Sequence, residues 1–141
     1  MRYMIIVRAT PMSEAGVMPE DPKLLQDMAT YHEELARAGV LLDGSGLRPS
    51  REGWRIGWAG AGKPVLTDGP FAETKELIAG YTLIQVRSPE EAMEWSRRFP
   101  RPFPDGVDCE IEVRRLYELE DFGTDPAIDR MREIGVGTSE R

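Results

Sequence analysis

Hydrophobic residues recur with a period of two along some segments of the chain and with a period near 3.6 along others. The first pattern is typical of β-strands and the second of amphipathic helices. A hairpin is indicated where two strand-like segments flank residues 60–62. In chain order the predicted elements are a strand over 2–8, a helix over 22–38, a strand from 40, a hairpin over 54–59 and 63–67, a strand over 78–87, a helix from 89 and a strand over 109–117.

Local signals mark where the two helices begin and end. Asp21 is a favourable N-cap before a proline, and Gly39 ends the first helix. Ser88 begins a capping box that is completed by Glu91, again with a proline at the first helical position. Residues 9–22, which carry several prolines and a glycine, are expected to form a loop.

The order of these elements predicts an α+β, ferredoxin-like fold, βαββαβ, with an inserted β-hairpin. One domain is expected over residues 1–118, followed by an acidic C-terminal tail over 119–141 with a short helix near 126–133. The strand over 2–8 is apolar on both faces. Both faces of the sheet are therefore expected to be covered.

Composition and charge narrow the classes of function. The net charge is −7 and the basic residues are scattered, which argues against binding to nucleic acid or to anionic membranes. Cys109 is the single cysteine, so it has no internal partner and a cytoplasmic location is expected. No apolar segment approaches the roughly 20 residues of a membrane span, and the N-terminus lacks the features of a signal peptide.

The segment over 68–76, DGPFAETKE, resembles the signature of the DGPF subgroup of YCII-related proteins. Further matching segments lie at 13–16, 77–80 and 120–123, so the resemblance covers about residues 1–123. It implies a ferredoxin-like domain that pairs into a dimeric α+β barrel. In that arrangement one face of the sheet packs on the helices and the other on a second copy of the chain.

The DGPF segment has two interpretations. As turn chemistry, Gly69 permits an unusual φ, Pro70 suits the start of a short helix, and the Asp68 carboxylate accepts hydrogen bonds from backbone N–H groups further on. As a binding site, its polar groups lie at the mouth of a pocket with Phe71, and a carboxylate there acts as a general base. Those polar groups are Asp68, Glu73, Thr74 and Lys75.

His32 is the only histidine, and histidine is the residue type whose charge changes near neutral pH. It lies at the edge of the apolar stripe of the first helix, beside Tyr31. Such a histidine is either a boundary residue or, if it approaches Asp68, half of an acid–base pair. The resemblance implies a His–Asp pair in the wider family, but alignment through Gly39 places that histidine nearer Met28, one helical turn away.

The remaining candidates are aromatic. Trp54, Trp58 and Trp95 can line a pocket for a flat ligand, and Trp58 is taken as a ligand-binding candidate together with Tyr31 and Phe71. No metal site is predicted, because one histidine and one cysteine, far apart in the chain, leave only carboxylates as further ligands. No nucleotide-binding motif is present, so no cofactor is predicted.

Two hypotheses about function follow. In the first, a homodimer binds a small molecule in a cleft near Asp68, Phe71 and the first helix, with cofactor-free acid–base chemistry if it is an enzyme. In the second, the protein is a non-catalytic regulatory or protein-interaction module. The residues leave open whether it is an enzyme. An apolar cleft with converging polar groups would favour the first hypothesis, and a flat, filled surface the second.

Overall fold

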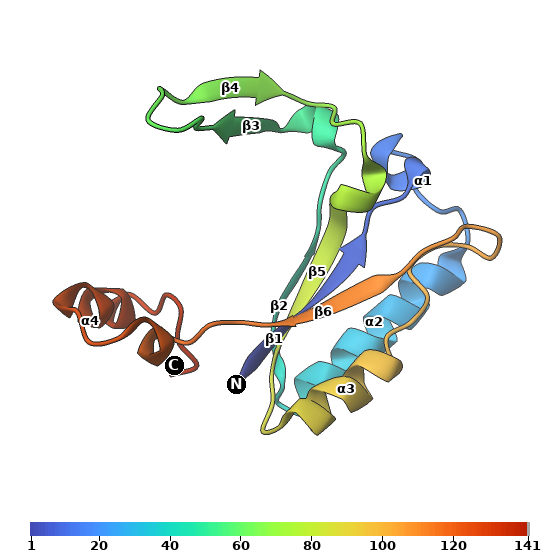
Figure 1. Cartoon of the computed structure of the whole chain (residues 1–141). Helices are drawn as coiled ribbons and strands as arrows, with labels where there is room; N and C mark the ends of the chain where they lie inside the picture. The colour runs from blue at the N-terminus through green and yellow to red at the C-terminus, as the bar shows by residue number, and fades with distance from the viewer. Residues whose placement is uncertain (141) are drawn as a thin grey trace.

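The computed structural model describes residues 1–140, and a four-stranded antiparallel sheet lies at its centre (Figure 1). The strand order β2–β5–β1–β6 is that of a ferredoxin-like fold. A separate two-stranded hairpin, β3–β4, is inserted between β2 and β5. The predicted fold is confirmed. The bounds are β1 (Arg2–Arg8), β2 (Leu41–Gly46), β3 (Trp54–Gly57), β4 (Val65–Asp68), β5 (Ile78–Gln85) and β6 (Ile111–Arg115).

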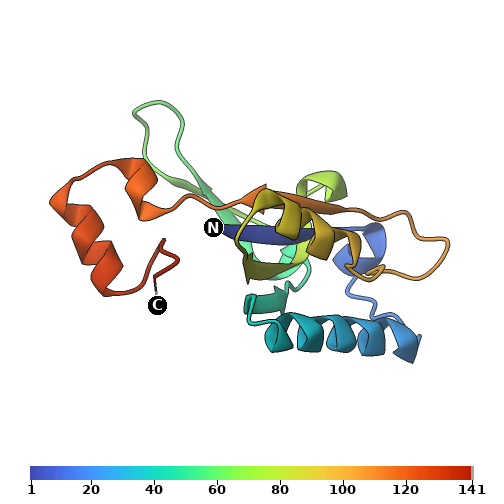
Figure 2. The ribbon, with the colours of Figure 1, turned by 90° about the horizontal axis from the view of Figure 1, so that it is seen from below.

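Two helices, α2 (Pro22–Arg37) and α3 (Pro89–Arg97), lie on one face of the sheet (Figures 1 and 2). The Asp21 side chain accepts a hydrogen bond from Lys23 N at 2.9 Å, which caps α2 as predicted. At α3, the Ser88 hydroxyl accepts from the Glu91 backbone N–H at 3.1 Å, as predicted. The Glu91 carboxylate accepts from the backbone N–H of Arg87, not from that of Ser88, so only one half of the predicted capping box forms. None of the helices within residues 1–140 has the length and apolar character needed to cross a membrane.

A short helix, α1 (Pro11–Glu14), forms where the sequence predicted a loop. Thr10 and Ser13 bind each other's backbone N–H groups in a capping box, at 2.9 and 3.2 Å. These two side chains satisfy N–H groups that a single helical turn leaves unpaired. The loop prediction was therefore wrong over this turn, because the proline that suggested a loop occupies the first helical position.

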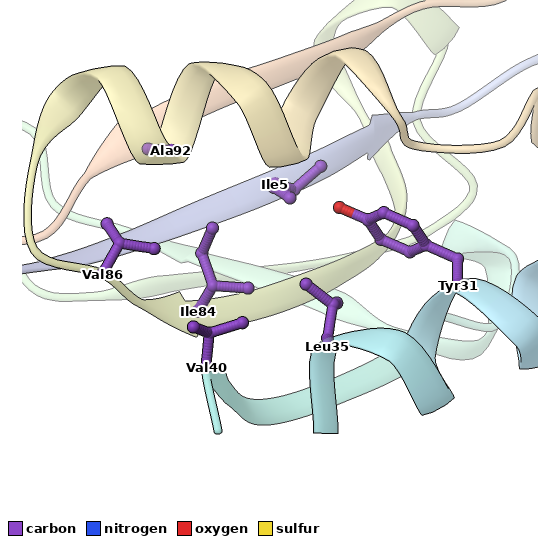
Figure 3. Packing of buried hydrophobic residues seen from close by; sticks show 7 residues of the cluster. All are labelled: Ile5, Tyr31, Leu35, Val40, Ile84, Val86 and Ala92. Carbon is purple, nitrogen blue, oxygen red and sulfur yellow. The ribbon is translucent and has the colours of Figure 1, made fainter. Parts of the chain in front are cut away.

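The core lies between this pair of helices and the sheet (Figure 3). Ile5 and Ile84 on the sheet and Leu35 on α2 have no exposed surface. The Tyr31 hydroxyl donates a 2.8 Å hydrogen bond to the Trp95 backbone oxygen and so ties α2 to α3. Burial raises the pKa of Tyr31 to about 12.

No element of residues 1–140 covers the opposite face of the sheet (Figure 1). Met4 and Ile6 of β1 stand there beside Leu83 and Tyr81 of β5, and all four are half-buried. The sequence predicted that both faces of the sheet are covered. Within residues 1–140 the helices cover one face, and the other has no cover. We call the other side the open face.

Residues 117–140 fold into a small unit that we call the C-terminal module. It contains a 3₁₀ turn, η3 (Leu119–Phe122), and α4 (Pro126–Glu133), the range in which the sequence predicted a short helix. Leu119 and Ile128 are buried inside it. The module is joined to the sheet through Arg2, whose guanidinium binds Glu118 at 2.8 Å and the Tyr117 backbone oxygen at 2.9 Å.

We predict that acid releases the C-terminal module. Burial alone would raise the pKa of Glu118, but hydrogen bonds from Ser139 and Arg2 outweigh it and hold that pKa below its ordinary value of 4.5. The stabilising contribution of this carboxylate is therefore present above pH 4.5 and lost as pH falls through the lowered pKa. The protection of the amides of residues 119–140, measured against the exchange rate of an unfolded chain at the same pH, should fall in that window while the protection of β1 and β5 persists.

Glu118→Gln should remove this pH dependence, and Glu133→Gln, on the exposed side of α4, should keep it. The account of the module is wrong if the protection factors of residues 119–140 in the native chain stay the same as the pH falls from about 6 to 3, a range that spans the usual titration of glutamate.

Candidate functional site

A cavity of about 550 Å³ lies between α2, the β2–β5 edge of the sheet and the loop that follows α3. Its wall is mostly apolar, with contributions from all three elements. Its polar lining residues are His32 and the buried Thr82, together with Asp21 at the start of α2 and Ser45 and Tyr81 on the sheet. The apolar side chains include Leu24, Met28, Leu41, Phe99 and Phe103.

The imidazole of His32 is held by two hydrogen bonds. Its Nδ1 lies 2.8 Å from the Met28 backbone oxygen, one turn earlier on α2, and its Nε2 lies 2.8 Å from Thr82 Oγ1. A carbonyl oxygen only accepts, so Nδ1 carries the proton of the neutral ring. Nε2 is then the acceptor, and the Thr82 hydroxyl donates to it. The geometry thus sets both the tautomer and the orientation of the ring.

Glycine makes this close packing of His32 against β2 feasible. A Cβ on Gly44 would lie 3.3 Å from His32 Nε2, tighter than most contacts of a Cβ. Thr82 stands opposite Gly44 in the β2–β5 register and is itself buried. The imidazole therefore lies over a glycine of the edge strand, with its Nε2 directed at β5.

The DGPF segment follows β4 and forms a separate structure. The Phe71 backbone N–H donates to Ser50 Oγ at 3.0 Å, and the Gly69 N–H donates to the Gly53 oxygen at 3.0 Å. Glu14 of α1 accepts hydrogen bonds from both the backbone N–H and the hydroxyl of Ser50. The segment is thereby joined to η1 (Ser50–Glu52) and to α1.

The physical reasons predicted for this turn need correction. Gly69 does not adopt a positive φ. It is needed because a Cβ there would collide with the Ser50 carbonyl oxygen. Pro70 follows a cis peptide bond, and the next helical turn, η2 (Thr74–Glu76), begins four residues later. The sequence predicted that the Asp68 carboxylate accepts hydrogen bonds from the backbone of the turn. In the structure the Phe71 backbone N–H donates to Ser50 Oγ instead.

Phe71 lies at a second cavity, of about 520 Å³, at the base of the hairpin. The Arg55 guanidinium carbon is 3.8 Å from the centroid of the Phe71 ring. Glu14 and Ser50 also line this cavity, but their polar atoms are engaged with each other. The sequence predicted one cleft near Phe71 and the first long helix. In the structure Phe71 and α2 line two separate cavities.

The structure does not bring Asp68 and His32 together. Asp68 is exposed at the end of β4, opposite Trp54 in the hairpin register. His32 lines the larger cavity with both ring nitrogens bound to Met28 and Thr82. The predicted pair is not formed within the chain, because the Ser50 contacts hold the DGPF turn at the base of the hairpin.

The other predicted ligand-binding residues lie outside the larger cavity. Tyr31 belongs to the core, with 4% of its surface exposed. Glu73 and Lys75 are exposed beside η2, and Thr74, the first residue of that turn, is half-buried. Trp58, 68% exposed, lies beyond the end of β3.

Thr82 is the residue of the site that sequence reasoning missed. It occupies an inward position on β5, between Gly80 and Ile84 on the face that packs under the helices. A buried polar residue on an otherwise apolar strand face requires a hydrogen-bond partner. That signal was present in the pattern of residues 78–87. Among residues 1–140, no three His, Cys, Asp or Glu side chains gather closely enough to hold a metal ion.

Comparison with known proteins gives the following similarities. The family model of the YCII-related domain matches residues 1–117. An uncharacterised protein of Rhizobium meliloti (strain 1021) is 30% identical over 107 residues, which cover 76% of this chain and 86% of that protein. The structure of 5-chloro-2-hydroxyhydroquinone dehydrochlorinase from Burkholderia phenoliruptrix AC1100, in complex with 2,5-dihydroxybenzoquinone, matches with a TM-score of 0.41 and 14% identity, over 84% of this chain and 95% of that one.

We predict that Gly69→Ala destabilises the protein by about 2–3 kcal/mol, because the added methyl group must displace the Ser50 backbone. Gly57→Ala is the matched control, since a Cβ there meets no atom within 4 Å. Urea denaturation monitored by circular dichroism measures both. Equal midpoints for the two variants would contradict a structural role of the glycine.

Proposed function

The chain belongs to the family of YCII-related domains, and from this premise we propose that it is a homodimer that binds a small, largely apolar molecule in the cavity around His32. The supporting observation is the His32–Thr82 hydrogen bond of 2.8 Å in the wall of an apolar cavity of about 550 Å³. Apolar clefts with a few converging polar groups are the usual form of small-molecule sites. The same observation favours binding over the alternative of a purely regulatory or interaction module.

The chemistry proposed for this pair is acid–base catalysis. Thr82 gives its hydroxyl proton to His32 Nε2 in the hydrogen bond, which leaves its oxygen lone pairs free to accept a proton from a ligand hydroxyl. Transfer of the ligand proton to Thr82 Oγ1, with transfer of the Thr82 proton to Nε2, yields a ligand anion and an imidazolium. The reverse transfer returns the proton to the product.

The homodimer is proposed to form through the open face. Met4, Ile6 and Leu83 give that face an apolar centre, and no part of residues 1–140 covers it. Burial of these side chains against a second copy would supply the cover that the sequence predicted for both sides of β1. Cytoplasmic location and the absence of nucleic-acid and membrane partners remain predictions.

A ligand retained during purification provides the test of binding. Native mass spectrometry of the wild-type protein should show a bound small molecule that is released on denaturation. Leu24→Trp fills the cavity from α2 and should abolish the bound mass, whereas Met93→Trp, on the exposed side of α3, should retain it. Retention of the same molecule by Leu24→Trp would place binding elsewhere and reject the proposal.

Thr82→Val tests the proton path, because it removes the hydroxyl and leaves His32 Nε2 without its partner. Nitrogen NMR of the single histidine should show a mixture of tautomers in Thr82→Val, where the wild type shows the Nδ1–H tautomer. Thr82→Ser, which keeps a hydroxyl, should behave like the wild type. Identical histidine spectra for Thr82→Val and the wild type would show that this hydrogen bond does not orient the ring.

A further inference from the structure

Two segments extend from the body of the protein and carry much of its exposed apolar surface. One is the hairpin over 54–68, which we call the hairpin arm, and the other is the C-terminal module. Of the sixteen large apolar side chains that are exposed within residues 1–140, ten belong to these two segments. They are Trp54, Ile56, Trp58, Val65 and Leu66 in the hairpin arm, and Tyr117, Phe122, Met131, Ile134 and Val136 in the module.

The total surface of the chain shows that this exposure is unusual. The accessible area is 9915 Å² for a mass of 15.9 kDa. A compact monomer of that mass exposes about 7,400 Å², so this chain exposes roughly 2,500 Å² in excess. Permanent homodimers bury about 2,000–5,000 Å² in total, or half of that on each subunit. The excess on one chain therefore matches what each subunit of a permanent dimer buries.

The hairpin arm has one apolar face and no cover for it. Trp54 pairs with Asp68 and Ile56 with Leu66 in the antiparallel register. Side chains that stand opposite each other share a face, so Trp54, Ile56 and Leu66 form one apolar surface. An isolated two-stranded hairpin of this length is marginal in water, and it gains stability only when such a face is packed against another element.

The C-terminal module has a small inner core and an apolar outer surface. Leu119 and Ile128 fill the inside. Met131 and Ile134 lie three residues apart at the end of α4, on neighbouring positions of the outer side. Ile134 is 75% exposed, and nothing within residues 1–140 covers it. The module also has an excess of five negative charges over 117–140, whereas the hairpin arm has an excess of one positive charge over 54–68.

The two segments leave the sheet from opposite ends. The hairpin arm follows the end of β2 that pairs with Gly80, near Arg8 of β1, whereas the module follows Arg115, which pairs with Tyr3. Both lie on the side of the sheet away from α2 and α3 (Figure 1). A two-fold axis that lies in the plane of the open face and runs across the strands exchanges the two ends of the sheet. It therefore brings the hairpin arm of one copy to the module of the other.

We propose that the hairpin arm of each chain packs its Trp54–Ile56–Leu66 face against the outer side of the C-terminal module of a second copy. The contact is made twice, once in each direction, as two-fold symmetry requires. It rests on the homodimer proposed above and assigns a role to two segments that the His32 cavity does not use.

Paired charge substitutions test this contact in the full-length chain. Leu66→Lys and Ile134→Glu should each raise the dissociation constant of the dimer by about tenfold or more, measured by sedimentation equilibrium, because each introduces a charge into an apolar contact. Mixing the two variants should restore dimers. In the mixed dimer one contact is unaltered, and in the other the new lysine faces the new glutamate. Met93→Glu on α3 is the control and should dimerise like the wild type.

The possible outcomes separate the two proposals. If Leu66→Lys and Ile134→Glu both dimerise like the wild type while Leu83→Glu on the open face is monomeric, the contact between arm and module is wrong and the homodimer stands. If the wild type is monomeric at every concentration, both fail. Should Leu66→Lys or Ile134→Glu unfold, Leu66→Cys and Ile134→Cys chains that also carry Cys109→Ala are mixed and treated with a short bismaleimide. A covalent heterodimer supports the contact, and its absence rejects it. Met93→Cys in place of Ile134→Cys is the control and should give no covalent heterodimer.

Discussion

The packing of two helices on a single face of the sheet is the constraint on which the rest of the structure depends. Ile5, Ile84 and Leu35 are fully buried in that layer, and Tyr31 joins the two helices through its hydroxyl. Near its N-terminal end, α2 stands off the β2–β5 edge, and the space left there is the cavity at His32. The same arrangement leaves the other face of the sheet open. The packing of both helices on one face therefore determines both the position of the cavity and the surface that is available to a partner.

The DGPF segment has its clearest role in holding the hairpin to the body of the protein. Hydrogen bonds to Ser50 and Gly53, and the close approach of Gly69 to the Ser50 carbonyl, account for its glycine without any ligand. Glu14 completes this connection from α1. A segment can thus characterise a fold by its sequence while the polar groups that converge on a cavity lie elsewhere, here on α2 and β5.

Much of the fold could be predicted because its signals are local. The apolar run of β1, the alternation in β5, the cap at Asp21 and the stripe on α2 each specify an element from neighbouring residues. The site could be predicted only in part. His32 was identified by its residue type, and Asp68 was its candidate partner. In the structure the partner is Thr82, fifty positions further along the chain. The sequence did not show this because the register of β5 under α2 is a long-range property. Tyr31 was assigned to a ligand for a similar reason, since an apolar stripe does not show which of its side chains faces α3.

NMR titration with phenol tests the central claim, that the cavity at His32 is the binding site, most directly. Phenol is a small flat molecule with one hydroxyl, which suits an apolar wall with one polar pair. The account predicts that shift changes concentrate on Met28, His32 and Thr82, which line the larger cavity. Shift changes confined to residues around Trp54 and Phe71, in the second cavity, would contradict it.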